Sequence, residues 1–288
     1  MSEPSADFEN VLYDVSENVA TVTLNRPERL NAIDHGPGSM EDDLIRALEL
    51  SDLRDDVRCT IVTGAGRAFS AGGHIGARVP KETAVDWFAF NELHDGSCER
   101  IRTMTKPSIG AINGVCYGSA FVLIAHLDLL VAVDHARLGL IETRFGSTGI
   151  EALPFLVGPQ WAKFLALSGE TITAAKAREI GLVLEVFPEG VFHYKVRDLA
   201  RRIAAMPRDA VVLNRRVVNA SVAAMGWYAN KESARALNAV ANSVAKLAEG
   251  VDGRRFTDVL EQDGWKAFKD LRDRAFTTPW LDNPAADR

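Results

Sequence analysis

Two short turns rich in small residues are the part of this sequence best suited to chemistry. They span residues 64–75 and 113–120, and each directly follows an apolar, strand-like segment. Small residues allow a ligand to approach the backbone closely, and a helix that begins near Ser119 would add unpaired N–H groups. Two such turns could direct two backbone N–H groups at one oxygen atom, which is the arrangement of an oxyanion hole.

The segments that surround these turns predict an α/β fold class. Apolar segments of strand length occupy residues 11–15, 19–24, 59–63, 108–112 and 129–133. Apolar residues at helical spacing, or a composition typical of helices, predict helices over residues 40–53, 83–104, 119–126, 152–168 and 174–180. Both small-residue turns would therefore follow strands.

The last third of the chain is helical in its periodicity. The predicted helices span residues 191–206, 210–224, 227–247 and 254–274. Apolar residues gather on single faces of these helices, as with Leu213, Val217 and Val218. We therefore divide the chain into residues 1–200 and a helical C-terminal region of residues 201–288. The apolar faces suggest packing on the first part or on other subunits.

Composition limits the classes of partner. The chain has 288 residues and a formal net charge of -6, which does not favour a nucleic-acid partner. The longest apolar run, residues 120–133, contains His126 and Asp128 and is too short to span a bilayer, so we expect no membrane partner. The first residues lack the basic and apolar blocks of a signal peptide, which predicts a cytoplasmic protein.

The three cysteines give no sign of a metal site. Cys59, Cys98 and Cys116 lack the spacing of metal ligands. Apolar neighbours predict that they are reduced thiols in the core. We therefore expect neither a metal nor a disulfide.

In its two turns and in several other segments, the chain resembles the crotonase superfamily, the enoyl-CoA hydratase/isomerase family. The matching segments are residues 23–32, 68–73, 106–114, 139–142, 168–170, 174–177, 181–183 and 263–268. The resemblance implies a spiral of ββα units in residues 1–200, which would bind the CoA thioester and hold the active site. It implies that the helical region of residues 201–288 mediates assembly into a homotrimer or a hexamer.

The resemblance also implies how substrate is held. Members of the family bind acyl-CoA thioesters, and the two backbone donors to the thioester oxygen fall here on Gly73 and Ser119. Arg29 and Ala32 lie in the segment that holds the CoA nucleotide, although Arg29 could also be a solvated loop residue. The pantetheine would lie against the backbone of four residues, Gly73, His74, Ile75 and Gly76. No separate cofactor is expected, because CoA is part of the substrate.

The catalytic carboxylates depart from the pattern of the family. Hydratases in it use two glutamates, and Glu142 falls on the second position. Its alternative is a loop glutamate that pairs with Arg144. The first position falls on Val122, which cannot move a proton. Glu151 could supply a second carboxylate, or it could simply favour the start of a helix.

Other side chains near the turns allow two interpretations each. His74 could carry a local charge or bond a loop carbonyl, and Tyr117 could place its hydroxyl in the acyl pocket or only pack. His126 is predicted to be a core histidine. Aromatic residues that could form an acyl wall or pack on a helix are Trp87, Phe88 and Phe90.

Three functions remain in competition. The first is an acyl-CoA enzyme in which Glu142 moves a proton and the backbone of Gly73 and Ser119 stabilises an enolate, for hydration or double-bond isomerisation. The second is a C–C lyase, decarboxylase or thioester hydrolase on the same fold. The third is a CoA-binding member without catalysis. No Gly-x-Ser-x-Gly elbow supports a serine hydrolase.

Overall fold

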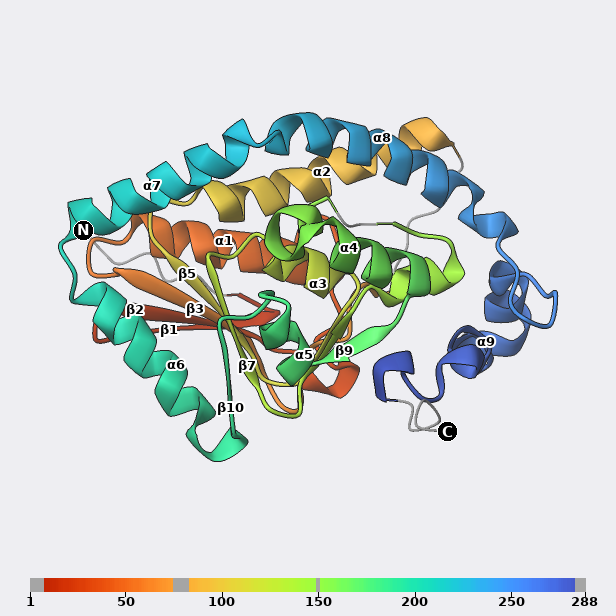
Figure 1. Cartoon of the computed structure of the whole chain (residues 1–288), viewed down its shortest axis with the longest axis horizontal. Coiled ribbons are helices and arrows are strands. Elements are labelled where there is room, and N and C mark those ends of the chain that lie inside the picture. Colours follow the sequence, from red (N-terminus) through yellow and green to blue (C-terminus); the bar gives the residue numbers. More distant parts are fainter. Residues whose placement is uncertain (1–7, 75–82, 149–150, 283–288) are drawn as a thin grey trace.

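A mostly parallel sheet forms the centre of the molecule (Figure 1). The computed structural model describes residues 8–74, 83–148 and 151–282, and within them this sheet has six strands. Their order is β1 (Val11–Ser16), β2 (Val19–Leu24), β3 (Cys59–Gly64), β5 (Ser108–Ile112), β7 (Leu129–Val133) and β10 (Glu185–Phe187). Only the hairpin of β1 and β2 is antiparallel among the pairs of this sheet. Strands that are buried on both faces are typical of such parallel sheets.

A second, smaller sheet lies beside the first. In the described ranges its order is β4 (Ala68–Ser70), β6 (Val115–Tyr117), β8 (Arg137–Gly139) and β9 (Thr171–Thr173). The chain passes from a strand of the large sheet to one of the small sheet and then into a connecting segment, three times in succession. This alternation confirms the expected α/β fold with ββα units. The short strands were not predicted, because three residues are too few to show a period.

The helices cover the large sheet on both sides. Their bounds are α1 (Met40–Leu53), α2 (Ala84–Thr103), α3 (Ser119–Ile124), α4 (Leu153–Ser168), α5 (Ala174–Glu179), α6 (Glu189–Ala204), α7 (Arg208–Ala224), α8 (Trp227–Val244) and α9 (Phe256–Asp273). Figure 1 shows α1, α2 and α8 stacked on one side of the sheet and α6 on the other. The start of α2 is defined by a capping box between Thr83 and Asp86.

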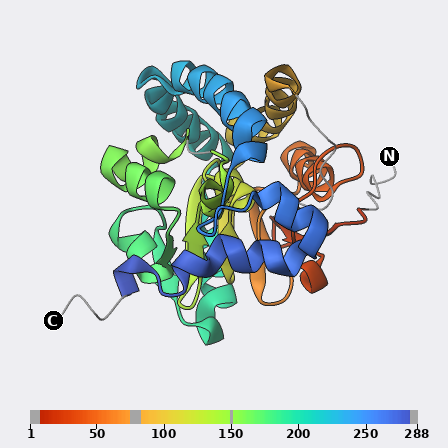
Figure 2. The same cartoon turned by 90° about the vertical axis from the view of Figure 1, so that its right-hand side faces the viewer.

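The C-terminal helices leave apolar side chains exposed, as their periodicity predicts. Leu213 and Val217 on α7 and Leu237 and Val240 on α8 are each more than half exposed. Figure 2 shows α9 crossing in front of the rest of the molecule. The division at residue 200 falls inside α6, which packs on β3, β5 and β7. Among the described residues, no helix is long and apolar enough to cross a membrane.

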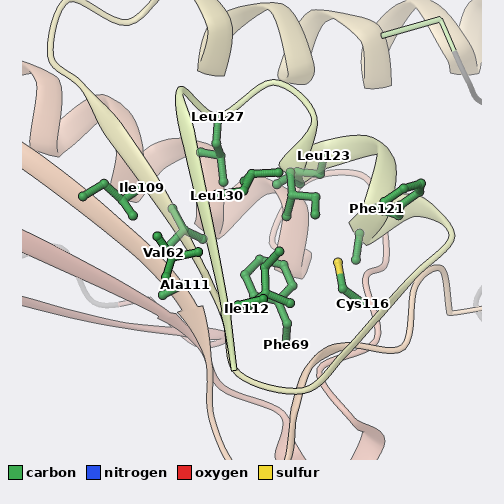
Figure 3. Packing of buried hydrophobic residues seen from close by; sticks show 14 of the residues in the cluster. Val62, Phe69, Ile109, Ala111, Ile112, Cys116, Phe121, Leu123, Leu127 and Leu130 are labelled. Atoms are coloured by element: carbon green, nitrogen blue, oxygen red, sulfur yellow. The ribbon is translucent and has the colours of Figure 1, made fainter. Parts of the chain in front are cut away.

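The three cysteines are free and buried, as predicted for core thiols. Cys116 on β6 lies in the main hydrophobic cluster, beside Phe121 of α3 (Figure 3). Phe69 lies beside Ile112 in the same cluster and is fully buried. The small sheet is therefore anchored to the large sheet by apolar packing.

We expect Phe69→Ala to lower the free energy of unfolding by about 3–5 kcal/mol, because the surrounding side chains cannot fill the space of a buried ring. Urea denaturation followed by circular dichroism would measure this change. Leu53→Ala is the control, since Leu53 is 82% exposed and should change stability by less than about 0.5 kcal/mol. Equal effects of the two variants would contradict the placement of Phe69.

Candidate active site

The two small-residue turns meet in the folded chain. Parallel pairing of β4 with β6 brings their ends together. A Cβ atom on Gly73 would lie 3.1 Å from the Oγ of Ser119, so the two residues are in contact. The first turn is held in place by a bridge from Gly73 to Ile33 and by a 2.7 Å hydrogen bond from the N–H of His74 to the carbonyl of Ile33.

Neither predicted donor gives its N–H to an acceptor among the described residues. In the described part of the chain, no acceptor is bonded to the N–H of Gly73. Ser119 is the first residue of α3, where no carbonyl of the helix itself can accept its N–H. Two backbone donors on contacting residues, neither bonded to a described acceptor, are what an oxyanion hole requires.

Glu142 packs directly against the second turn. Its carboxylate Oε2 lies 3.0 Å from the position of a Cβ atom on Gly118, which has φ 56° and ψ -127°. Glycine is therefore required at this position, both for the backbone conformation and for the close approach. Pairing of Tyr117 with Gly139 places β8 beside β6, and Glu142 follows in the short 3-10 helix Ile141–Phe145.

The pKa of a neighbouring thiol agrees with this placement of the Glu142 carboxylate. Burial and the nearby Glu142 charge together raise the pKa of the Cys116 thiol well above its ordinary value. Arg144, the alternative partner of Glu142, is directed elsewhere: its Nη1 lies 2.8 Å from Asp273 Oδ1 and its Nε donates to the carbonyl of Gly169. The Glu142 carboxylate thus lies beside Gly118 and near Cys116.

One cavity of about 830 Å³ adjoins these groups. The predicted site residues that line it are Gly73, His74, Ser119, Val122, Glu142 and Glu151. Trp87 and Phe90 also line the cavity, so part of the predicted aromatic wall is present, whereas Phe88 and Tyr117 are not among its lining residues. Burial raises the pKa of the Tyr117 hydroxyl.

Glu151 and Val122 share the cavity with Glu142. The carbonyl of Glu151 accepts a 2.7 Å hydrogen bond from Asn230 Nδ2, which ties its backbone to α8. Val122 is half-buried and offers only methyl groups. The cavity wall therefore has carboxylates at 142 and 151 and an apolar side chain at 122.

The residues proposed for the CoA nucleotide lie away from this cavity. Arg29 is exposed and Ala32 is half-buried, and neither lines the cavity. Their loop is joined to the first turn, because Asn31 Nδ2 donates to the carbonyls of Ala65 and Ala68, both at 2.9 Å. Ile75 and Gly76, proposed to line the pantetheine, lie outside the described residues.

Several lining residues were missed by sequence reasoning. Helix α8 contributes Lys231, Ala234, Arg235, Asn238 and Asn242. Ser147 Oγ lies 2.8 Å from Asn242 Oδ1, which fastens this helix to the active-site loop. Arg235 pairs with Asp95 at 2.7 Å, so its charge is largely compensated. Nothing in the sequence places a helix from the last third beside the two turns.

Histidines occupy different environments. His126 is buried, as predicted, and its ring meets Trp227 edge-on with 5.5 Å between centroids. Nδ1 of His74 is buried without a hydrogen-bond partner among the described residues, so this nitrogen bonds no loop carbonyl there. His35 and His94 lie on either side of Glu41 at the cavity wall.

The chain is similar to known proteins over most of its length. Residues 14–258 match the family model described as enoyl-CoA hydratase/isomerase. The chain is 30% identical to 1,2-epoxyphenylacetyl-CoA isomerase of Escherichia coli (strain K12) over 221 residues, covering 74% of this chain and 83% of that protein. It is 31% identical to crotonyl-CoA hydratase of Syntrophomonas wolfei, covering 74% and 82%.

The fold is also similar to solved structures. One is the crystal structure of an enoyl-CoA hydratase/isomerase from Xanthobacter autotrophicus Py2, with a TM-score of 0.86 and 30% identity. The match covers 94% of this chain and 100% of that one.

Proposed function

Because this chain belongs to the enoyl-CoA hydratase/isomerase family, we propose that it acts on an acyl-CoA thioester through an enolate. The observation that supports this most directly is the contact between Gly73 and Ser119, with the Glu142 carboxylate against the adjoining Gly118. A base and two backbone donors that no described residue occupies, all on one cavity, are the parts that enolate formation requires.

The proposed reaction begins with proton transfer. The Glu142 carboxylate removes a proton from the carbon next to the thioester carbonyl, and the electron pair of that C–H bond forms the enolate. The N–H groups of Gly73 and Ser119 donate hydrogen bonds to the enolate oxygen, where the negative charge develops. Glu142 then returns the proton to the same carbon or to another carbon of the acyl chain.

Val122 favours double-bond isomerisation over hydration. Isomerisation needs one group that moves a proton between two carbons, and Glu142 can do this alone. Hydration also needs activation of a water molecule, which a valine side chain cannot provide. Hydration is the second candidate reaction, because Glu151 lines the same cavity and could activate water.

Binding of CoA is assigned to the rim of the first turn. Arg29 and Arg67 are exposed, and neither forms an ion pair with a described residue. They could therefore pair with phosphate groups of the nucleotide. We propose no separate cofactor, and we place the protein in the cytoplasm.

Assembly is proposed to use the exposed apolar faces of α7 and α8. Leu213, Val217 and Val240 would be covered in a homotrimer or a hexamer, which would remove this surface from water. Light scattering coupled to size exclusion would give the subunit number.

The test is exchange of the α-proton of acyl-CoAs in deuterated water, with saturated, unsaturated and aryl chains. We expect exchange with at least one thioester, and a shifted double bond in the product by mass spectrometry. Thioester binding without any exchange would contradict the proposal. A shortened acyl chain, loss of CO2 or free CoA would instead assign C–C cleavage, decarboxylation or hydrolysis.

A further inference from the structure

The wall of the cavity contains a cluster that the proposed enolate chemistry does not use. His35 Nδ1 lies 2.6 Å from one carboxylate oxygen of Glu41, and His94 Nδ1 lies 2.5 Å from the other. Among the described residues, this is the only group of three or more His, Cys, Asp or Glu side chains whose ligand atoms lie within 4.8 Å of one another. All three residues line the cavity.

We propose that His35, Glu41 and His94 form a binding site for a divalent transition-metal ion of the zinc class. Two imidazoles and one carboxylate are a donor set that such ions prefer. Because the three side chains lie at the cavity wall, a water molecule or a substrate atom could complete the coordination.

The required geometry is close to the one present. Zinc–nitrogen and zinc–oxygen bonds of about 2.0–2.2 Å separate neighbouring ligand atoms by about 3.3 Å in a tetrahedral site. The distances of 2.6 and 2.5 Å run from the two imidazoles to different oxygens of Glu41. If one oxygen is the ligand, its own contact must widen by about 0.7 Å and the other imidazole must turn toward the same oxygen, from ligand atoms that already lie within 4.8 Å of one another. Small side-chain rotations can supply this change, and the ion then replaces the protons that now lie between each imidazole and the carboxylate.

The surroundings of Glu41 suit a cation. The carboxylate is buried, and no Lys or Arg of the described residues forms an ion pair with it. Its two oxygens are contacted by the imidazoles of His35 and His94, and carboxylate oxygen and imidazole nitrogen are both ligands that ions of this class accept.

Neighbouring groups hold the three ligands in place. Cys98 Sγ lies 4.0 Å from His94 Nε2, so the remaining ring N–H of a metal-bound His94 has a sulfur to which it can donate. The loop that carries His35 is tied down by Asp34, whose carboxylate accepts a 2.8 Å hydrogen bond from the N–H of Met40 and pairs with Arg26. The site would join α1 to α2.

Equilibrium dialysis of the full-length protein against Zn²⁺ tests this inference. Any histidine tag must be removed, the protein treated with a chelator, and the buffer kept mildly alkaline, because protons compete with the metal for imidazole. Elemental analysis is expected to give one zinc ion per chain. Co²⁺ in place of Zn²⁺ should give the visible absorption of a tetrahedral cobalt site.

Variants identify the ligands without any measurement of activity. We expect His35→Ala and His94→Ala to weaken Zn²⁺ binding by at least about 100-fold, since the loss of an outer-shell partner alone costs 10–100-fold. His135→Ala is the control: His135 is exposed, contacts Asp134, and should leave binding unchanged. Thermal melts would establish that each variant is folded.

A wild-type crystal soaked in Zn²⁺ gives a readout that needs no variant. An anomalous difference peak between His35, Glu41 and His94 would support the site. The absence of one-to-one binding by the wild type, or an anomalous peak elsewhere only, would overturn the proposal. So would folded His35 and His94 variants that bind zinc as tightly as the wild type.

Discussion

Glu142→Gln is expected to slow α-proton exchange by about 10²–10⁴-fold, the range that general acid–base catalysis contributes. Glutamine preserves the shape that packs on Gly118 but cannot accept the proton from carbon. Acyl-CoA binding should therefore change only a few-fold, because the backbone donors remain. Exchange followed by NMR and titration calorimetry with a saturated acyl-CoA would measure the two quantities separately.

Two further glutamate variants make this result specific. Glu261→Gln is the matched control, since Glu261 is an exposed residue of α9 and should have no effect. Glu151→Gln tests the second carboxylate: it should leave exchange largely intact and should lower any hydration of an enoyl-CoA. Turnover by Glu142→Gln at the rate of the wild type would rule out Glu142 as the base.

Ser119→Pro is expected to lower the rate by about 10²–10³-fold, the typical loss for one oxyanion donor. Proline has no N–H, so the variant removes the proposed hydrogen bond to the thioester oxygen. Because Ser119 is the first residue of α3, proline is compatible with the helix, where the missing N–H breaks no helical bond. Steady-state kinetics with the best acyl-CoA would measure the loss.

Ser119→Ala separates the backbone from the side chain. Alanine keeps the N–H and removes only the hydroxyl, so this variant should retain most of the activity. A melting temperature of Ser119→Pro close to that of the wild type would exclude unfolding as the cause of its loss. If Ser119→Ala were as impaired as Ser119→Pro, the hydroxyl and not the N–H would be the functional group.

Much of the large sheet was predictable because its signals are local. The sequence predicts strands at residues 108–112 and 129–133 with the bounds of β5 and β7, since short, largely apolar segments between turns are distinctive. The strands of the small sheet were missed. Residues 68–70 and 137–139 are stabilised by pairing with distant segments. Such pairing cannot be predicted from the three residues of each strand alone.

The candidate site was predictable only in part for the same reason. The small residues of the two turns are visible in the sequence, and the resemblance to the family assigned the donors to Gly73 and Ser119 and the carboxylate to Glu142. The contribution of Lys231 and Arg235 from α8 was not visible, because it depends on where that helix packs. The contact between His94 and Glu41 was not visible either, because the two residues lie 53 positions apart in the sequence.

The sequence by itself determined the α/β class, the helical C-terminal region and the two turns, because periodicity and small residues act within a few positions of the chain. Only the tertiary structure decided that Gly73 touches Ser119 and that Glu142 lies on Gly118. The tertiary structure alone also showed that Glu151 lines the same cavity and that His35 and His94 meet Glu41 at the wall of that cavity. Such contacts depend on the packing of whole sheets and helices, which no short stretch of sequence encodes.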